Sequence, residues 1–355
     1  MKKVLYLTNI EVPYRVRFFN EFAKECELTV LYERRKSLNR NKNWSKSEKI
    51  NFKAEYLEGI QIGNEYSFSP KILKYIFGKY DGIIIGCYNS PVQMFAMLVM
   101  RICRISFIIS IDGEIFLDLK RLKGKIKKFF LSGAIKYLAA GEKAANSLSA
   151  VVRRDKIEVY YFSSLYENEL KSHAEKGFKA KRNNTVLVIG QYFDYKGMDV
   201  ALRAAAMDSN IYYKFIGMGD RTDLFNKEQN AAAVGNVEII PFLSKDELEK
   251  EYESCAMLVL PTRQECWGLV VNEAASYGLP IISTWGSGAA VEFLADQYHQ
   301  NLTKIGNAEA LLICIKQNIE NADLSAYSNY LIYKSQFYSI EKSVFAHIRA
   351  LEYLN

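Results

Sequence analysis

Metal-type histidine clusters, paired cysteines and long apolar runs are the features that this sequence lacks. Its three histidines, at positions 173, 299 and 347, have neither the spacing of a metal site nor that of a catalytic triad. Its six cysteines are scattered without a C-x-x-C pair, and several lie in apolar runs, so we expect buried free thiols. No apolar run reaches the roughly 18 residues that a membrane-spanning helix needs. The sequence therefore argues against metal sites, disulfides, Ser-His-Asp chemistry and membrane spans.

The composition is that of a folded protein with an excess of basic residues. Hydrophobic residues make up 49% of the chain and charged residues 25%, which is enough apolar material for full cores. The length of 355 residues predicts two domains. The basic start of the chain, 1–8, has a short apolar part that is typical of a first strand rather than of a leader peptide. We therefore expect a cytoplasmic protein.

Short apolar runs alternate with helical patterns along most of the chain, and this alternation predicts an α/β fold with parallel, doubly wound sheets. A Lys-rich stretch without an apolar period, 169–184, is predicted to be a linker. It separates a first domain, 1–168, from a second domain, 185–325, and helices are expected in 326–355. The expected strands are 4–7, 28–32, 52–57, 82–86, 106–111, 137–140, 157–161, 185–189, 237–240, 256–260 and 280–282.

The most informative stretch follows the predicted strand 256–260. A helix is expected to begin near Gly268 and to end at Gly278, with a proline just beyond it. The helix dipole and the unpaired N–H groups of the first turn favour an anion such as a phosphate at the carboxyl end of the strand. The amides concerned are those of Gly268, Leu269 and Val270.

Two carboxylates bracket this turn, Glu265 and Glu273. In one continuous helix they would be about 12 Å apart along the axis, so we expect Glu265 on a loop that folds back over the start of the helix. Together with Trp267-Gly-Leu and Gly278-Leu-Pro, the pair resembles the E-x7-E signature of the GT4 family of retaining glycosyltransferases. The opening segment, 9–20, is similar to members that build bacterial capsule, O-antigen or exopolysaccharide.

The resemblance implies the GT-B fold, in which two Rossmann-like domains face each other across a cleft. The first domain would bind the acceptor and the second the donor, with the last helix returning to the first domain. The implied reaction is retaining transfer of a sugar from a nucleotide diphosphate, with UDP expected, to a lipid-linked or polysaccharide acceptor in surface glycan synthesis. No metal and no further cofactor are implied.

The resemblance also assigns roles to single residues. Lys196 matches the cation that holds the donor diphosphate, whereas Gln191 stands where an arginine is usual. Glu265 would stabilise positive charge at the anomeric carbon, and Glu273 would bind ribose hydroxyls. The full set of predicted donor-binding residues is Gly190, Gln191, Lys196, Gly217, Phe242, Leu243, Glu265, Trp267, Gly268, Leu269, Val270 and Glu273.

On the acceptor side we predict Asn9, Tyr14 and Arg15, which lie in and after the first strand-to-helix loop. A solvated arginine and a packing tyrosine are an alternative at positions 15 and 14. Asp112 follows a predicted strand near the place where many relatives have a histidine, so it joins Lys196 as a predicted catalytic residue. An alternative role for Asp112 is to cap the next helix.

The segment Lys120–Phe130 carries six basic residues and no acidic residue between positions 120 and 128. Leu122, Ile126, Phe129 and Phe130 fall on one face of the helix that this segment predicts. Such a basic amphipathic helix favours an anionic membrane surface and a peripheral location at the inner face of the membrane. An ordinary domain helix with a solvated basic face is the alternative. No nucleic-acid-binding motif accompanies the net charge of +7.

Three other functions remain open from sequence. A glycoside hydrolase would use Glu265 and Glu273 as acid and base about 5 to 10 Å apart. A nucleotide-sugar epimerase of the same GT-B shape would act without an acceptor. A non-catalytic sugar-nucleotide binding protein would not depend on the carboxylate of Glu265.

Overall fold

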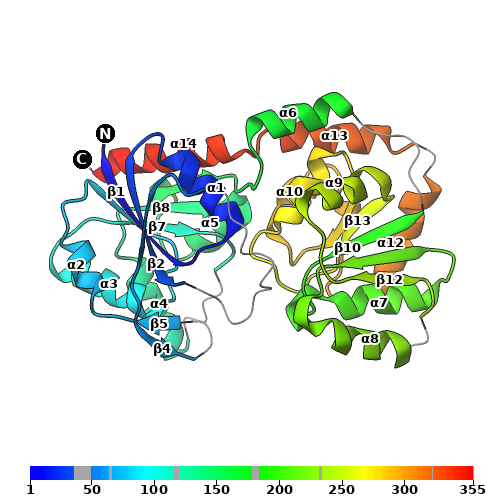
Figure 1. Cartoon of the computed structure of the whole chain (residues 1–355), viewed down its shortest axis with the longest axis horizontal. Helices are drawn as coiled ribbons and strands as arrows, with labels where there is room; N and C mark the ends of the chain where they lie inside the picture. The colour runs from blue at the N-terminus through cyan, green and yellow to red at the C-terminus, as the bar shows by residue number, and fades with distance from the viewer. Residues whose placement is uncertain are drawn as a thin grey trace. The chain divides into compact units, whose positions relative to one another are not determined.

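The computed structural model describes residues 1–35, 49–63, 66–115, 120–177, 184–231, 234–321 and 323–354 (Figure 1). Contacts divide the chain into two compact units. Unit 1 consists of Met1–Ser164 together with Ile340–Asn355, and unit 2 consists of Leu165–Ser339. None of the helices in the described part of the chain is long and apolar enough to cross a lipid bilayer.

The core of unit 1 is a seven-stranded parallel sheet in the order β3-β2-β1-β6-β7-β8-β9. Its inner strands are continuous runs of buried residues, as expected for a parallel sheet that is covered on both faces. The strands are β1 (Lys3–Ile10), β2 (Glu27–Arg34), β3 (Lys53–Tyr56), β6 (Gly82–Ile85), β7 (Ile108–Ile111), β8 (Lys136–Ala140) and β9 (Ile157–Tyr160). A separate antiparallel hairpin is formed by β4 (Ile60–Ile62) and β5 (Tyr66–Phe68).

The helices of unit 1 come from both ends of the chain. They are α1 (Pro13–Phe22), α2 (Ile72–Ile76), α3 (Pro91–Ile102), α4 (Leu122–Leu131), α5 (Gly141–Ser149) and α14 (Ile340–Leu351). The helix α14, drawn in red in Figure 1, packs against α1, β8 and β9. Its buried face includes Val344, His347 and Leu351. The amino-terminal sheet is therefore completed by the last helix of the chain.

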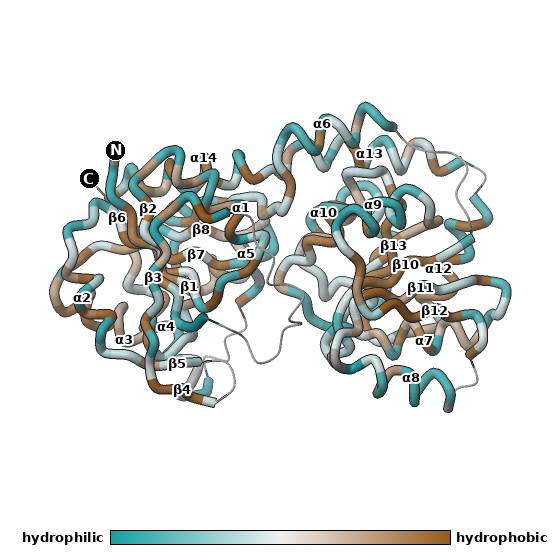
Figure 2. Tube along the Cα trace, viewed as in Figure 1, coloured by the Kyte–Doolittle hydropathy of each residue, from teal (hydrophilic) through white to brown (hydrophobic). Residues whose placement is uncertain are grey.

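Unit 2 contains a six-stranded parallel sheet in the order β12-β11-β10-β13-β14-β15. Its strands are β10 (Thr185–Ile189), β11 (Tyr212–Ile216), β12 (Val237–Ile240), β13 (Met257–Leu260), β14 (Ile281–Thr284) and β15 (Leu302–Thr303). Its helices are α6 (Glu167–Lys176), α7 (Met198–Met207), α8 (Thr222–Ala231), α9 (Lys245–Ser254), α10 (Leu269–Ser276), α11 (Gly288–Leu294), α12 (Ala308–Glu320) and α13 (Ser325–Ser335). Figure 2 shows that hydrophobic residues are concentrated on the inner strands, whereas α8 is largely hydrophilic.

The strand order of each sheet reverses once. In unit 2 the chain runs from β10 outward to β11 and β12, and then returns to β13 before it runs to β14 and β15 on the other side. Unit 1 has the same reversal between β1 and β6. In open parallel sheets a ligand binds outside the carboxyl ends of the strands at this reversal. The residues that follow β10 and β13 are therefore the first place to look for a site.

The predicted α/β architecture of two doubly wound parallel sheets is confirmed. The predicted linker at 169–184 is wrong in its first half, because Glu167–Lys176 forms α6 within unit 2. The helix is polar, but Leu170 and His173 give it a narrow buried face. Glu169 also accepts a hydrogen bond from the backbone N–H of Tyr166 at 2.8 Å, which caps the helix start. The part of the predicted linker at 178–183 lies outside the described residues.

Candidate functional site

Lys196 and Glu265 are in direct contact in unit 2. Lys196 ends the short 3-10 turn η3 (Asp194–Lys196) after β10, and Glu265 lies in the loop after β13. The Lys196 ammonium donates a hydrogen bond to Glu265 Oε2 within an ion pair. The two side chains keep 21% and 16% of their exposure, so the pair is shielded but still reached by solvent. It therefore lies at the reversal of the sheet, where a ligand is expected.

The turn that carries Lys196 is fixed to the loop after β13 by backbone contacts. Gly197 has a φ of +67°, and a Cβ atom there would lie 2.0 Å from the carbonyl oxygen of Pro261. Only glycine allows both the left-handed conformation and this close approach. The Tyr195 carbonyl also accepts a hydrogen bond from the backbone N–H of Arg263 at 2.8 Å. These contacts fix the backbone on both sides of Lys196, and therefore the position from which its side chain reaches Glu265.

Arg263, two residues before Glu265, is a cation that is already paired. Its guanidinium donates to both carboxylate oxygens of Asp199, each at 2.7 Å. Burial by itself raises the pKa of Asp199, but the hydrogen bonds and charge of Arg263 outweigh it and lower that pKa. Arg263 thus joins its loop to α7, and Lys196 is the cation that faces Glu265.

Glu265 lies on a loop that folds back, as the sequence predicted. Its backbone N–H donates to the carbonyl of Gly286 at 2.9 Å, and its own carbonyl accepts from the N–H of Gly288 at 3.2 Å. Residue 265 and Ser287 form an isolated parallel bridge. The loops after β13 and β14 therefore hold the backbone of Glu265 from both sides.

The amino terminus of α10 lies beside the Glu265 side chain. Gly268 is the N-cap residue with a φ of +104°, and a Cβ atom there would lie 3.3 Å from Glu265 Cγ. Leu269 and Val270, which supply the next amides, are half-buried. The predicted helix start near Gly268 is confirmed. A carboxylate, a lysine and the positive end of a helix dipole therefore share one short stretch of surface.

Two other residues of the motif have defined partners. Trp267 is buried, and its indole N–H donates to Asn272 Oδ1 at 2.8 Å, so the ring is part of the packing of unit 2. Glu273 lies in α10 and accepts a hydrogen bond from the Tyr252 hydroxyl at 2.9 Å. Glu273 is half-buried.

The remaining predicted donor residues follow β10, β11 and β12. Gly190 has a φ of +151°, and a Cβ atom there would lie 3.8 Å from Lys196 Cδ. A Cβ atom at Gly217 would lie 3.7 Å from the Gly190 carbonyl oxygen, so the two glycine turns are adjacent. Gln191 is half-buried next to Gly190. Phe242 and Leu243 lie in the loop between β12 and α9, and Phe242 is 38% exposed.

In unit 1 the predicted residues Arg15 and Asp112 contact each other. Arg15, in α1, is only 5% exposed and forms an ion pair with Asp112, which follows β7. Burial lowers the pKa of Arg15, but the charge of Asp112 more than offsets this and raises it. The solvated arginine considered from sequence is therefore excluded. Asp112 also accepts a hydrogen bond from the Tyr160 hydroxyl at 2.7 Å.

The other two predicted acceptor-side residues are placed differently. Tyr14 is half-buried and makes an edge-to-face contact with Phe162, with ring centroids 5.7 Å apart. Asn9 was expected in a loop but lies in β1, which extends to Ile10. Its side-chain oxygen accepts from the Ile10 N–H at 2.8 Å. The sequence analysis did not identify Tyr160 or Tyr252. They are two of 24 tyrosines in the chain, and no sequence motif distinguishes them.

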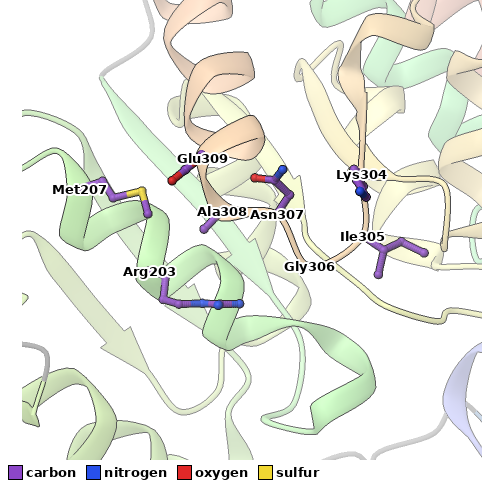
Figure 3. A pocket seen from close by; sticks show the side chains of 8 residues that line it. All are labelled: Arg203, Met207, Lys304, Ile305, Gly306, Asn307, Ala308 and Glu309. Carbon is purple, nitrogen blue, oxygen red and sulfur yellow. The ribbon is translucent and has the colours of Figure 1, made fainter.

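A hollow of about 380 Å³ lies elsewhere in unit 2 (Figure 3). It is lined by parts of α7, the start of α12 and the segment between β15 and α12. Its residues are Arg203, Met207, Lys304, Ile305, Gly306, Asn307, Ala308 and Glu309. None of the predicted donor residues lines it. Within the described residues there is no group of three or more His, Cys, Asp and Glu side chains arranged to hold a metal ion.

Comparisons with known proteins point in the same direction. The model of the family described as glycosyl transferases group 1 matches residues 171–335. An uncharacterized glycosyltransferase of Methanocaldococcus jannaschii is 25% identical over 247 residues, covering 68% of this chain and 66% of that protein. An uncharacterized protein in the cps region of Klebsiella pneumoniae is 27% identical over 142 residues. The match covers 39% of this chain and 38% of the Klebsiella protein. The chain thus matches less than two thirds of the length of these relatives.

Among solved structures, the Anabaena protein HepE in complex with UDP and glucose is similar over 99% of this chain and 100% of its own, with a TM-score of 0.75. The sequence identity is 16%, so the likeness concerns the fold alone. Together with the two parallel sheets it confirms the predicted GT-B fold.

Proposed function

We propose that this protein is a retaining, metal-independent glycosyltransferase of the GT4 type that takes its sugar from a nucleotide diphosphate, with UDP as the expected nucleotide. One observation carries the proposal: Lys196 and Glu265 meet beside the amino terminus of α10, at the reversal of the unit 2 sheet. A cation and helix amides suit a diphosphate. A carboxylate beside them suits a sugar that becomes positively charged when the diphosphate leaves.

In the proposed reaction the bond between the anomeric carbon and the diphosphate oxygen breaks, and its electron pair stays with the diphosphate. Lys196 and the amides near Gly268 stabilise that negative charge, while Glu265 stabilises the positive charge on the sugar. The acceptor oxygen forms the new bond on the same face of the sugar, and its proton passes to the departing diphosphate. Glu273 holds the ribose. Asp112, Arg15, Tyr14 and Asn9 belong to the proposed acceptor side.

UDP release tests this assignment. UDP-sugars are supplied to the purified protein with and without a lipid-linked glycan extract, and UDP is measured. Lys196→Ala is expected to lower turnover 100-fold or more, the usual effect of removing one group that stabilises charge in the transition state. Lys250→Ala, at an exposed position of α9, makes the same change of charge and should leave turnover unchanged. Undiminished turnover in Lys196→Ala would sink the proposal.

The same assay separates the other functions. An epimerase converts the UDP-sugar without an acceptor and releases no UDP. A hydrolase that uses Glu265 and Glu273 acts on glycans without any nucleotide. A binding protein gives no turnover, and its affinity for a UDP-sugar is unchanged in Glu265→Gln. Acceptor-dependent UDP release that is lost in both Lys196→Ala and Glu265→Gln is the result expected for a transferase.

We also propose that α4 binds the inner face of an anionic membrane. A lipid-linked acceptor for surface glycan synthesis would be presented at that face. Leu122, Ile126 and Phe129 are 73%, 43% and 47% exposed. Gly124 and Leu131 are buried, and Phe130, which was predicted on the same face as Leu122, is half-buried and packs against the core of unit 1. Leu122, Ile126 and Phe129 remain exposed, whereas an ordinary domain helix would bury such residues.

Basic residues flank these exposed apolar residues on one side, at helical spacing: Arg121, Lys125 and Lys128, all exposed. The combination fits the boundary between lipid headgroups and acyl chains. Sedimentation with vesicles tests it: binding is expected with phosphatidylglycerol vesicles and not with phosphatidylcholine vesicles. Leu122→Ser should weaken that binding about tenfold, since it removes one leucine side chain that the bilayer would bury. Ile313→Ser, at an exposed site on α12, is the matched control. Equal sedimentation of Leu122→Ser and the unmodified protein contradicts this role of α4.

A further inference from the structure

We propose that Tyr252 is a positioning residue for the nucleotide, because its hydroxyl holds the carboxylate of Glu273 in the orientation that receives the ribose hydroxyls of a nucleoside diphosphate. The inference rests on the donor site proposed above and adds to it a residue from outside the motif. It also predicts a specific property, which is discrimination between ribose and deoxyribose.

The side chain of Glu273 accepts a hydrogen bond from a neighbouring helix. Tyr252, in α9, is 2% exposed, and its hydroxyl donates to Glu273 Oε2 at 2.9 Å. Burial and the adjacent charge of Glu273 raise the pKa of Tyr252 well above its usual value, so the phenol stays protonated and remains a donor. An ionised carboxylate has about four acceptor positions. The bond from Tyr252 therefore restrains the rotation of the carboxylate through Oε2.

The backbone of Glu273 is held as well. Ser276 donates a hydrogen bond from its hydroxyl to the Glu273 carbonyl at 2.7 Å. The imidazole of His173, from α6, joins this group: its Nδ1 lies 2.9 Å from Ser276 Oγ and its Nε2 lies 2.8 Å from the Tyr277 hydroxyl. Burial lowers the pKa of His173, which favours its neutral form. The helical turn that carries the carboxylate of Glu273 is thus hydrogen-bonded to a second helix, α6.

Three aromatic rings fill the space around these bonds. Tyr277 stacks on the ring of His173 with centroids 4.0 Å apart, and it stacks on Tyr252 at 5.7 Å. The phenol of Tyr252 is therefore enclosed between α9 and α10, with little freedom to turn. Rigid support of this kind is what precise recognition by a side chain requires.

The consequence concerns selectivity more than overall binding. A fixed carboxylate that accepts hydrogen bonds from ribose hydroxyls is left with an unmet acceptor when one hydroxyl is missing, and such sites discriminate strongly against the analogue. A carboxylate that can rotate finds water or another partner instead, so it discriminates less. Removal of the Tyr252 hydroxyl should therefore reduce the preference for ribose.

The experiment measures dissociation constants by calorimetry for UDP, 2′-deoxy-UDP and 3′-deoxy-UDP. Tyr252→Phe removes one oxygen atom and keeps the ring. It is expected to weaken UDP binding about tenfold and to change the binding of at least one deoxy analogue much less, so that the ratio between them falls. Tyr213→Phe is the matched control, since the buried Tyr213 hydroxyl has no hydrogen-bond partner within the described residues. It should leave all three constants unchanged.

A steady-state measurement adds a second readout. With the UDP-sugar as the varied substrate, Tyr252→Phe should raise KM with little change in kcat, because the ribose is held equally before and during transfer.

The outcomes separate the two proposals. If Tyr252→Phe weakens UDP and both deoxy analogues by the same factor, Tyr252 acts only in folding and the inference is wrong. An unchanged UDP-to-deoxy ratio with normal UDP affinity also overturns it, while the proposed function stands. If the unmodified protein binds none of the three nucleotides, the donor site itself is wrong and the inference falls with it.

Discussion

At the scale of single residues, Gly197 shows how one position fixes the candidate site. It has a φ of +67°, and a Cβ atom there would lie 2.0 Å from the Pro261 carbonyl oxygen. Gly197→Ala is therefore expected to combine backbone strain of about 1–2 kcal/mol with a forced movement of the loop after β13. Because Lys196 precedes this residue, binding of UDP should be lost along with stability.

Gly306 provides the control for this prediction. It also has a positive φ, +78°, but a Cβ atom there would have no neighbour within 4 Å. Gly306→Ala therefore reports the strain of a positive φ without a clash, and we expect its thermal midpoint to fall by about 2–4 °C for each kcal/mol. Gly197→Ala should fall at least twice as far. Equal midpoints in the two variants, with UDP binding retained, would show that the approach to Pro261 does not constrain the site.

The residues that sequence could identify were those with a local signature. Lys196 is followed by a glycine, and Glu265 lies eight positions before Glu273. Both patterns can be recognised in the sequence alone. Tyr252 has no such pattern, because its role depends on the packing of α9 against α10. The ion pair between Arg263 and Asp199 was not predicted, since it joins residues 64 positions apart. Contacts between segments that are distant in the sequence could not be predicted from its periodicity.

At the scale of elements, α14 brings a buried histidine into unit 1. The ring centroid of His347 lies 4.8 Å from that of Phe18 and 4.9 Å from that of Tyr160, and its Nδ1–H donates to the Ser343 carbonyl. Burial lowers the pKa of His347 to about 4, and the nearby charge of Arg15 adds to this effect while Asp112 opposes it. The helix therefore packs with its histidine neutral.

This lowered pKa makes the stability of unit 1 depend on pH. Between pH 6.5 and about 4 the unfolded chain binds a proton at His347 that the folded chain does not, so stability falls as the pH falls. The loss is roughly 3 kcal/mol, since each pKa unit corresponds to about 1.4 kcal/mol. Below about pH 4 this histidine contributes no further loss.

Urea unfolding from pH 7.5 to 4 measures this loss. Carboxylates also titrate in that window, so the quantity of interest is the difference between the unmodified protein and His347→Leu. The variant should lose less stability on acidification by roughly 3 kcal/mol. His299→Leu, at an exposed position, should keep the full slope. If His347→Leu and the unmodified protein have parallel pH profiles, His347 is not buried as a neutral ring.

Elements with strong apolar runs were predicted well, whereas the polar helix α6 was not. The strands of the unit 1 sheet, the strands β10, β12 and β13 of unit 2, and the helix α10 follow from short apolar runs and from the glycine that ends the helix. The helix α6 was assigned to a linker because its buried face consists of only two side chains, Leu170 and His173. Those two residues matter because they meet α10 and α13, which are more than 100 positions away. Long-range packing, rather than local preference, makes that segment a helix.

At the scale of the whole molecule, the two units differ in how the chain builds them. Unit 2 is one continuous segment, Leu165–Ser339, and it contains every predicted donor residue from Gly190 to Glu273. Unit 1 needs two segments, because α14 covers α1 and β9. Without α14, the side chains of Phe18, Phe22 and Tyr160 that surround His347 would be exposed. The units should therefore respond differently when they are separated.

The fragment 165–339 is expected to fold and to bind UDP with an affinity similar to that of the whole chain. The fragment 1–164 is expected to bind an apolar dye such as ANS and to melt without cooperativity, because an exposed apolar face and loose packing are marks of an incompletely folded domain. Addition of a peptide that spans 340–355 should restore a cooperative transition to that fragment. Circular dichroism, dye binding and calorimetry with UDP measure these three results. Cooperative melting of 1–164 alone would show that α14 is dispensable to its sheet, whereas failure of a folded 165–339 to bind UDP would show that the donor site needs residues outside unit 2.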